Sequence, residues 1–307
     1  MRKHATPLRY PGGKQRLTPF VLQVLEANDC VGGHYVEPYA GGAGVAIELL
    51  LSENVAHVHL NDSSYPIYAF WNSIRTASDE LCRLISDTPL TVPEWKRQRA
   101  ILRANDGHSE LEVGFSAFYL NRCNRSGVLT GGVIGGLEQK GKWKIDARFP
   151  RTELVRRVQA IAARADAITL HNLDAEDFMI QHIPQLPENT LVYCDPPYYE
   201  KSSRLYLDRY THEDHARIAG VIQTQLARRW LVSYDGAPEI LALYEGRNSF
   251  LYDLQYNASR VYKGTEVFIF SDDVIVPPSS SLTFLDDVLR EFADRTRGDA
   301  MIAAAVV

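Results

Sequence analysis

Short runs of apolar, β-branched and aromatic residues recur along the chain, and a turn or helix signal follows most of them. Six runs predict buried strands: Tyr35–Tyr39, Val55–Leu60, Ala167–Leu170, Thr190–Cys194, Trp230–Ser233 and Val267–Phe270. Helical patterns lie between them, for example over Gly44–Leu51 and His212–Leu226. Because strands that alternate with helices form parallel sheets covered by helices, the pattern predicts an α/β fold with a mainly parallel sheet.

The alternation stops between about residues 74 and 164. This stretch has helical patterns and then a glycine-rich segment, VLTGGVIGGLEQKGKW, which predicts turns or a β-hairpin. We expect a mainly helical subdomain carrying a β-hairpin at 74–164, inserted into a catalytic domain formed by 1–73 and 165–276. Residues 277–307 begin with PPSSS and continue as an acidic amphipathic stretch, which is typical of a linker and tail.

Composition narrows the class of protein. The 307 residues are 45% apolar and 23% charged, which is ordinary for a folded protein. No apolar run is long enough to cross a bilayer, and the first residues lack the apolar core of a secretory signal. The four cysteines form no C-x-x-C pair, so we expect free thiols in a reducing cytoplasm and no zinc site or redox motif.

The formal net charge of −5 weakly disfavours a nucleic-acid partner, but the distribution of charge favours one. Residues 113–170 contain ten basic and four acidic side chains, so this segment carries +6 and the rest of the chain −11. A polyanion responds to a local basic surface more than to the total charge. For any single residue of the segment, an ordinary solvated surface charge remains the alternative.

Four motifs carry the candidate chemistry, and three of them are weak alone. Tyr10–Lys14 (YPGGK) lacks the spacing of a triphosphate loop, and a plain turn is the alternative. The glycines of Glu37–Gly44 (EPYAGGAG) let the backbone approach a ligand closely, but they do not form the dinucleotide pattern. Asp62 follows a predicted strand, where α/β proteins hold a ribose; a helix N-cap explains it equally well.

The fourth motif, Asp195-Pro196-Pro197-Tyr198, is the most specific. Its two prolines fix the turn after a predicted strand and remove two backbone donors. The Asp195 carboxylate and the Pro196 carbonyl are then fixed acceptors beside the flat face of Tyr198. Such acceptors suit an amino group on a planar ring, whereas a rigid turn with a buried tyrosine is the alternative.

Taken in order, RYPGGK, EPYAGGAG, LND, NLDAEDF, DPPY and VSYDG resemble the motifs of the Dam-like, D12-type DNA adenine-N6 methyltransferases, over about residues 7–271. One departure is the glycine turn, commonly F-x-G-x-G, in which Tyr39 and Ala43 replace the first and last members. The resemblance implies a Rossmann-like sheet, S-adenosyl-L-methionine as cofactor, and methyl transfer to the N6 amine of an adenine flipped out of double-stranded DNA.

The resemblance also implies site residues. The catalytic residues would be Asp195, Pro196, Pro197 and Tyr198. The cofactor site would consist of Tyr10, Lys14, Glu37, Tyr39, Gly41, Gly42, Asp62, Asp177, Phe178 and Asp195. Asp62 would hold the ribose, and Asp177 and Phe178 would lie against the cofactor's adenine, unless they only form a capped, packed helix start. No metal is expected.

The inserted segment would recognise the target. The DNA-binding residues would be Asn121, Arg122, Asn124, Arg125, Lys140, Lys142, Arg260 and Lys263. Arginine pairs bidentately with guanine and asparagine with adenine, whereas the lysines suit phosphates. The alternatives are an RNA adenine methyltransferase and a catalytically dead DNA-binding module of the same fold. The sequence leaves open whether a cognate restriction endonuclease accompanies the protein.

Overall fold

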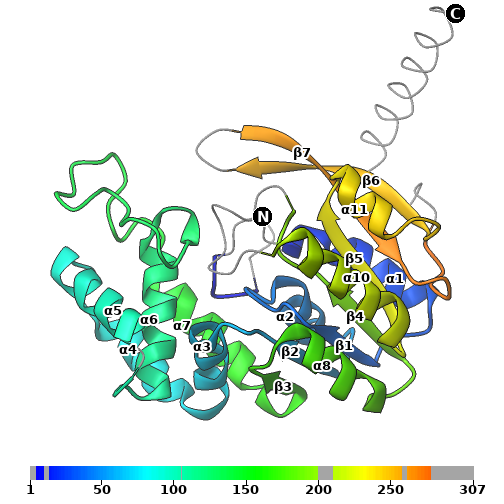
Figure 1. Cartoon of the computed structure of the whole chain (residues 1–307). Helices are drawn as coiled ribbons and strands as arrows, with labels where there is room; N and C mark the ends of the chain where they lie inside the picture. The colour runs from blue at the N-terminus through cyan, green and yellow to red at the C-terminus, as the bar shows by residue number, and fades with distance from the viewer. Residues whose placement is uncertain (1–4, 10–13, 105, 200–209, 258–260, 278–307) are drawn as a thin grey trace, which may run out of the picture.

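A single mixed sheet forms the centre of the protein. The computed structural model describes residues 5–9, 14–104, 106–199, 210–257 and 261–277, and of 252–257 and 261–265 it describes only the backbone. Within this part the strand order is β3-β2-β1-β4-β5-β7-β6 (Figure 1). The strands are β1 (His34–Glu37), β2 (His57–Asn61), β3 (Ile168–His171), β4 (Thr190–Cys194), β5 (Arg229–Asp235), β6 (Ser249–Asn257) and β7 (Val261–Phe270).

The sheet is mainly parallel, as the sequence predicts. Strands β1 to β5 run parallel to one another, whereas β7 lies antiparallel between β5 and β6. Their side chains alternate between two apolar clusters, so that Leu191 and Tyr193 point to one face and Val192 and Cys194 to the other. A sheet buried on both faces needs such near-continuous apolar strands.

Helices cover both faces of the sheet. One layer contains α1 (Thr18–Ala27), α2 (Gly44–Leu51), α3 (Tyr65–Thr76) and α7 (Arg151–Ala162), whose apolar residues join the first cluster. The other layer contains α8 (Ala175–Gln181), α10 (His212–Gln225) and α11 (Pro238–Leu243). The short 3-10 turn η1 (Lys14–Leu17) leads into α1.

The segment between β2 and β3 extends into a helical bundle beside the sheet (cyan to green in Figure 1). It adds α4 (Ser78–Asp87), α5 (Val92–Ala104) and α6 (Glu110–Cys123). Helix α4 packs against α3 and α7, α6 packs against α3 and α4, and α5 packs against α6. Helix α6 starts at a capping box between Ser109 and Glu112, and every residue from Val113 to Cys123 is buried. Helices α3 and α7 cover the sheet and also contact the bundle, so the two parts share these helices. The predicted subdomain boundaries at residues 74 and 164 therefore stay predictions.

The glycine-rich segment after α6 does not form the expected β-hairpin. From Asn124 to Pro150 the structure has the short 3-10 turn η2 (Arg125–Gly127), other turns and one isolated antiparallel bridge, between Asn124 and Val133. Gly135 and Gly136 have φ of 86° and 78°, and successive left-handed residues curl the backbone instead of extending it. The segment is therefore an irregular loop rather than a pair of strands.

Two further expectations concern thiols and membranes. All four cysteines are free and buried. Within the described ranges, no helix combines the length and apolar composition that spanning a bilayer requires. The predicted tail, apart from residue 277, lies outside the described residues.

Candidate active site

Three of the motifs meet at the carboxyl edge of the parallel strands. Strands β1, β2 and β4 are parallel neighbours, so their last residues, Glu37, Asn61 and Cys194, end at the same edge of the sheet. Buried Asn61 ties this edge together by donating hydrogen bonds to the carbonyls of Pro38 at 3.0 Å and Leu173 at 3.1 Å. In open α/β sheets, ligands bind at this edge.

Asp62 organises the glycine turn that leads from β1 into α2. Its carboxylate accepts hydrogen bonds from the backbone N–H of Gly41 at 2.8 Å and of Ser64 at 2.9 Å. Burial raises the pKa of Asp62 to about 6, although the two N–H donors oppose the shift. Gly41 and Ala43 have φ of 46° and 44°, which turns the chain sharply at this point. The structure thus gives Asp62 a structural task; a contact with a ribose stays a prediction.

Glu37 closes the start of α2. Its side chain accepts a hydrogen bond from the Ala46 N–H at 3.1 Å, in the first turn of the helix, where an acid is favourable. The residue is 5% exposed, and burial raises its pKa to about 8; nearby Asp195 also raises it. A positive charge placed between Glu37 and Asp195 would therefore favour the ionised form of both.

The Asp195 carboxylate is a fixed acceptor at the end of β4. The Ser233 hydroxyl donates to Asp195 Oδ1 at 2.7 Å, and the Tyr193 hydroxyl lies 2.8 Å from Ser233 Oγ. The Lys14 ammonium is 3.4 Å from the same Asp195 oxygen, and the Asp195 side chain remains 27% exposed. Burial raises the pKa of Asp195, whereas Lys14 and Ser233 lower it. One side of this carboxylate is therefore anchored and the other faces outward.

Glu266 joins two distant motifs, and sequence reasoning missed it. It is fully buried on β7 and accepts hydrogen bonds from Lys14 Nζ at 2.6 Å and from the Tyr198 hydroxyl. Lys14 also donates to the Tyr198 hydroxyl at 2.6 Å, across 184 positions of sequence. The signal was present as a carboxylate at the start of the apolar run EVFIF. A buried charge of this kind requires a partner, which here is Lys14.

Tyr198 lies largely inside this network. Its side chain is 3% exposed, and the Lys14 ammonium is 5.0 Å from its ring centre. The neighbouring Pro196 is buried and Pro197 half-buried. Stacking of the tyrosine ring on a target base stays a prediction.

Other predicted cofactor residues have different surroundings. The hydroxyl of half-buried Tyr39 is 3.4 Å from that of Tyr210. The Gly42 carbonyl accepts a hydrogen bond from Thr6 at 2.6 Å, and the Gly41 carbonyl accepts one from Trp71 at 2.9 Å. Tyr10 lies outside the described residues.

The pair Asp177-Phe178 forms a capped, packed helix start. Phe178 is 1% exposed, and its ring packs against those of His171 and His182 at 5.0 and 5.7 Å. Asp177 is exposed, while Asp174 caps α8 by accepting from the Glu176 N–H. Contact of this pair with a cofactor's adenine stays a prediction.

Asn121 was expected to contact DNA but supports the fold instead. Its side chain is 1% exposed and clamps the backbone of Arg9: Oδ1 accepts from the Arg9 N–H at 2.7 Å, and Nδ2 donates to the Arg9 carbonyl at 2.7 Å. Nδ2 also donates to the Gly127 carbonyl at 2.9 Å. Its hydrogen-bonding groups are thus committed to the segment that leads to Lys14.

The same correction applies to Arg122 and Asn124. Arg122 is 7% exposed and donates to the carbonyls of Arg148 at 2.6 Å and Pro7 at 3.4 Å. Burial lowers its pKa to about 9. Asn124 is 0% exposed and accepts from the Trp95 indole at 2.7 Å. Arg122 ends a helix that is buried on all sides, and Asn124 follows directly after it, so both side chains are occupied by partners inside the protein.

The remaining DNA candidates are at the surface or outside the described part. Arg125, Lys140 and Lys142 are exposed. Lys140 forms an ion pair with Glu138 at 3.2 Å, and Lys142 lies 5.8 Å from the ring of Trp143. Arg260 is outside the described residues, and only the backbone of Lys263, on β7, is described. These five stay predictions.

Comparison with known proteins places the chain in a family. The family model "D12 class N6 adenine-specific DNA methyltransferase" matches residues 10–258. The DNA adenine methylase of Escherichia coli strain K12 is 23% identical over 238 residues, which cover 74% of this chain and 79% of that protein. The DNA adenine methylase of Salmonella typhi is 23% identical over 215 residues, 68% of this chain and 70% of that protein.

Among solved structures, an rRNA methyltransferase from Streptomyces viridochromogenes aligns with 87% of this chain and 88% of its own, at 12% identity. Its TM-score of 0.38 is too low to carry an argument. The family match covers most of the chain, including the glycine turn, Asp62 and the Asp195–Tyr198 motif. The chain therefore belongs to the D12 class of N6 adenine-specific DNA methyltransferases.

Proposed function

We propose that this protein transfers a methyl group from S-adenosylmethionine to the N6 amine of an adenine within a short sequence of double-stranded DNA. The observation that carries the proposal is the Asp195 carboxylate, anchored by Ser233 and Lys14 at the same sheet edge as the glycine turn. Membership of the D12 class supports adenine in DNA as the substrate. The free, buried thiols suit a reducing cytoplasm.

The groups at the sheet edge fit S-adenosylmethionine. Asp62 has carboxylate oxygens for ribose hydroxyls, and its N–H partners keep it in place. Glu37 and Asp195 are carboxylates whose pKa values burial raises, and a cationic ligand offsets the cost of ionising them. When bound, this cofactor supplies a methyl group made electrophilic by a sulfonium. The further residues proposed to contact it are Tyr10, Lys14, Tyr39, Gly41, Gly42, Asp177 and Phe178.

The chain's own part in catalysis is to hold and polarise the amine. The lone pair of an exocyclic N6 amine is delocalised into the ring, which makes the nitrogen a weak nucleophile. Hydrogen bonds from the amine to Asp195 and to the Pro196 carbonyl would draw the nitrogen toward tetrahedral geometry and orient its lone pair. Lys14 and Ser233 favour the ionised form of Asp195, which is the form that accepts from the amine. Fixed acceptors stabilise the charge that develops on the nitrogen, and alignment lowers the entropic barrier.

The target base must leave the duplex to reach this acceptor. Enzymes that react with a base extrude it into a pocket, so we propose that the adenine flips out and stacks on Tyr198. The exposed cations Arg125, Lys140 and Lys142 are proposed to contact the DNA, and Arg260 and Lys263 remain proposed contacts on the sequence pattern alone.

Replacement of Asp195 by alanine tests the proposal. Asp195→Ala removes a principal acceptor, and loss of one such group typically lowers turnover on the order of 10²–10³-fold. Transfer of a tritiated methyl group to DNA measures turnover, and circular dichroism measures folding. Asp166→Ala is the matched control, because this aspartate is exposed and distant in sequence from the motifs. A folded Asp195→Ala variant with the turnover of the control would contradict the proposal.

A further inference from the structure

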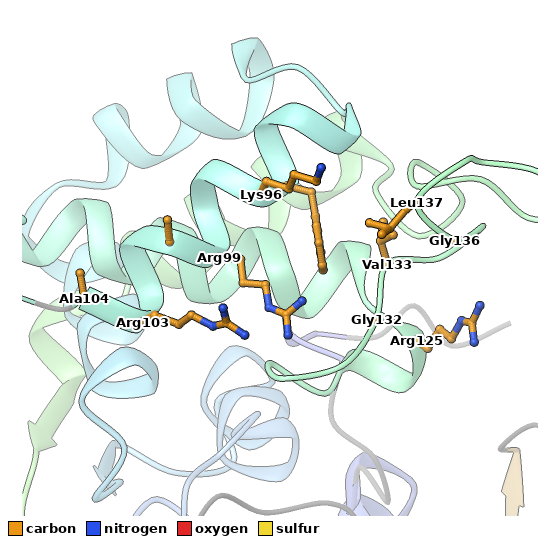
Figure 2. Close-up of a pocket in the computed structure, with 11 residues that line it drawn as sticks. Lys96, Arg99, Arg103, Ala104, Arg125, Gly132, Val133, Gly136 and Leu137 are labelled. Atoms are coloured by element: carbon orange, nitrogen blue, oxygen red, sulfur yellow. The ribbon is translucent and has the colours of Figure 1, made fainter.

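A broad groove lies between α5 and the loop that follows α6. Its volume is about 800 Å³, and its lining includes Trp95, Lys96, Arg99, Arg103, Arg125 and Leu137. Figure 2 shows Arg99 and Arg103 extending from α5 in the same direction, with Arg125 across the groove from them. The α5 cations that line the groove, Lys96, Arg99 and Arg103, belong to no motif that the proposed chemistry uses.

The spacing on α5 puts these cations on one face. Lys96, Arg99 and Arg103 follow the pattern i, i+3 and i+7, which forms a stripe along one side of a helix. Ala100 and Ala104 lie on the same stripe and also line the groove. Small side chains between long cations let another backbone approach the helix closely.

The groove cations differ from the neighbouring arginines in their partners. Arg97, the residue after Lys96, forms an ion pair with Glu94 at 2.8 Å, and Arg83 on α4 forms one with Glu80 at 2.7 Å. In the part of the chain that the structure describes, the side chains of Lys96, Arg99, Arg103 and Arg125 have no hydrogen bond or ion pair. Arg99 instead lies 5.0 Å from the ring of Trp95.

The floor of the groove is fixed. Trp95 is 3% exposed, and its indole N–H donates to Asn124 at 2.7 Å. The Asn124 side chain in turn donates to the carbonyls of Val128 and Leu129, each at 2.9 Å, at the start of the loop. The buried Asn124 side chain therefore connects α5 to the loop on the other side of the groove.

We propose that this groove binds the sugar–phosphate backbone of the DNA substrate, with Lys96, Arg99, Arg103 and Arg125 on its phosphates. The inference rests on the proposed function and extends it from Arg125 to a face of α5 that no motif indicated. Seven residues of helix rise about 10 Å, and one strand of duplex carries a phosphate every 3.4 Å or so of its axis. The stripe on α5 therefore spans about three phosphates. These cations have no acidic partner among the described residues, and such a cluster in a protein of net charge −5 suits a polyanion.

The test compares two double variants. Arg99→Gln with Arg103→Gln removes two groove cations, whereas Arg83→Gln with Arg97→Gln removes two paired cations outside the groove and changes the net charge equally. Binding is titrated between 50 and 200 mM salt with two fluorescent, unmethylated duplexes. One contains the sequence that the protein methylates, and the other contains the same bases in scrambled order. Thermal unfolding checks that both variants are folded.

The groove variant should bind both duplexes more weakly, and the slope of log K against log salt should become shallower by about 1.8 for two lost phosphate contacts. From 50 to 200 mM salt, the factor by which the affinity of the groove variant falls should be about 12 times smaller than the factor for the wild type. The control variant should keep the wild-type slope. An unchanged slope, equal weakening in the two variants, or a loss confined to the target duplex would each overturn the groove proposal. If the wild-type protein methylates no DNA, the proposed function itself fails; if it methylates DNA with these slopes unchanged, only the groove assignment fails.

Discussion

Asn121→Ala separates a structural clamp from a DNA-reading residue. The Asn121 amide makes three hydrogen bonds to backbone groups of Arg9 and Gly127, at 2.7, 2.7 and 2.9 Å. The side chain is 1% exposed, so water does not readily replace these partners. A buried hydrogen bond contributes about 1 kcal/mol, and an unpaired buried group costs roughly 1–3 kcal/mol. We expect the free energy of unfolding to fall by about 3 kcal/mol.

The substitution should also reach the active site. Arg9 lies five positions before Lys14, whose ammonium holds Asp195 and Glu266, so a loosened Arg9 should weaken cofactor affinity and lower turnover. Urea unfolding followed by tryptophan fluorescence measures stability, and calorimetry measures cofactor binding. Exposed Asn189→Ala is the control, with an expected change within about 0.5 kcal/mol.

A residue that reads a base would give the opposite pattern. Its loss would leave stability unchanged and reduce discrimination between target and scrambled duplexes by about 1–3 kcal/mol. An Asn121→Ala protein with wild-type stability and this loss of discrimination would refute the structural role.

Two further predictions follow from buried titratable groups. Glu266→Gln removes a charge that raises the pKa of Asp195, so the acid limb of the turnover profile should move to lower pH; an unmoved limb in a folded variant would argue against this coupling. Burial and four nearby histidines lower the pKa of His59 to about 3, whereas the unfolded chain takes up this proton near pH 6.5, so stability should fall as pH drops from about 6.5 toward 3. At about 1.4 kcal/mol per pH unit, His59 should lower the free energy of unfolding by roughly 2–3 kcal/mol by pH 4.5, and His59→Gln should remove this loss. Urea unfolding at pH 7 and 4.5 measures it, and an equal loss of unfolding free energy in the two proteins would contradict the prediction.

The sequence predicted the sheet well where strands are buried on both faces. The run Thr190–Cys194 is almost entirely apolar, and its bounds are those of β4. The run Val267–Phe270 marks only the buried end of β7, because the strand begins with the less apolar residues VYKGTE. Strand β6 was missed because it lies at the edge of the sheet, where one side needs no partner strand and the pattern is weaker.

Three of the four motifs, the glycine turn, Asp62 and Asp195–Tyr198, could be placed together from the sequence because each follows a strand, and parallel strands end at one edge of the sheet. Glu266 could not be placed in this way, because its partners come from Lys14 and Tyr198, far away in sequence. The family resemblance and the basic segment suggested Arg122 as a DNA contact, but neither reveals whether a basic side chain faces solvent, and Arg122 is buried. The apolar stretch VGFSAFYL was the available signal: a helix that is apolar on all sides is buried, together with the polar residues at its end.

Nucleoside analysis of reacted DNA tests the central claim most directly. Unmethylated duplex DNA is incubated with the purified protein and S-adenosylmethionine, digested to nucleosides and analysed by mass spectrometry, with Asp195→Ala as the blank. The account predicts N6-methyladenine that accumulates with the wild-type protein and is nearly absent with the variant. Methylated cytosine in its place, or N6-methyladenine formed equally by both proteins, would contradict the assignment of Asp195 as the acceptor for an adenine amine.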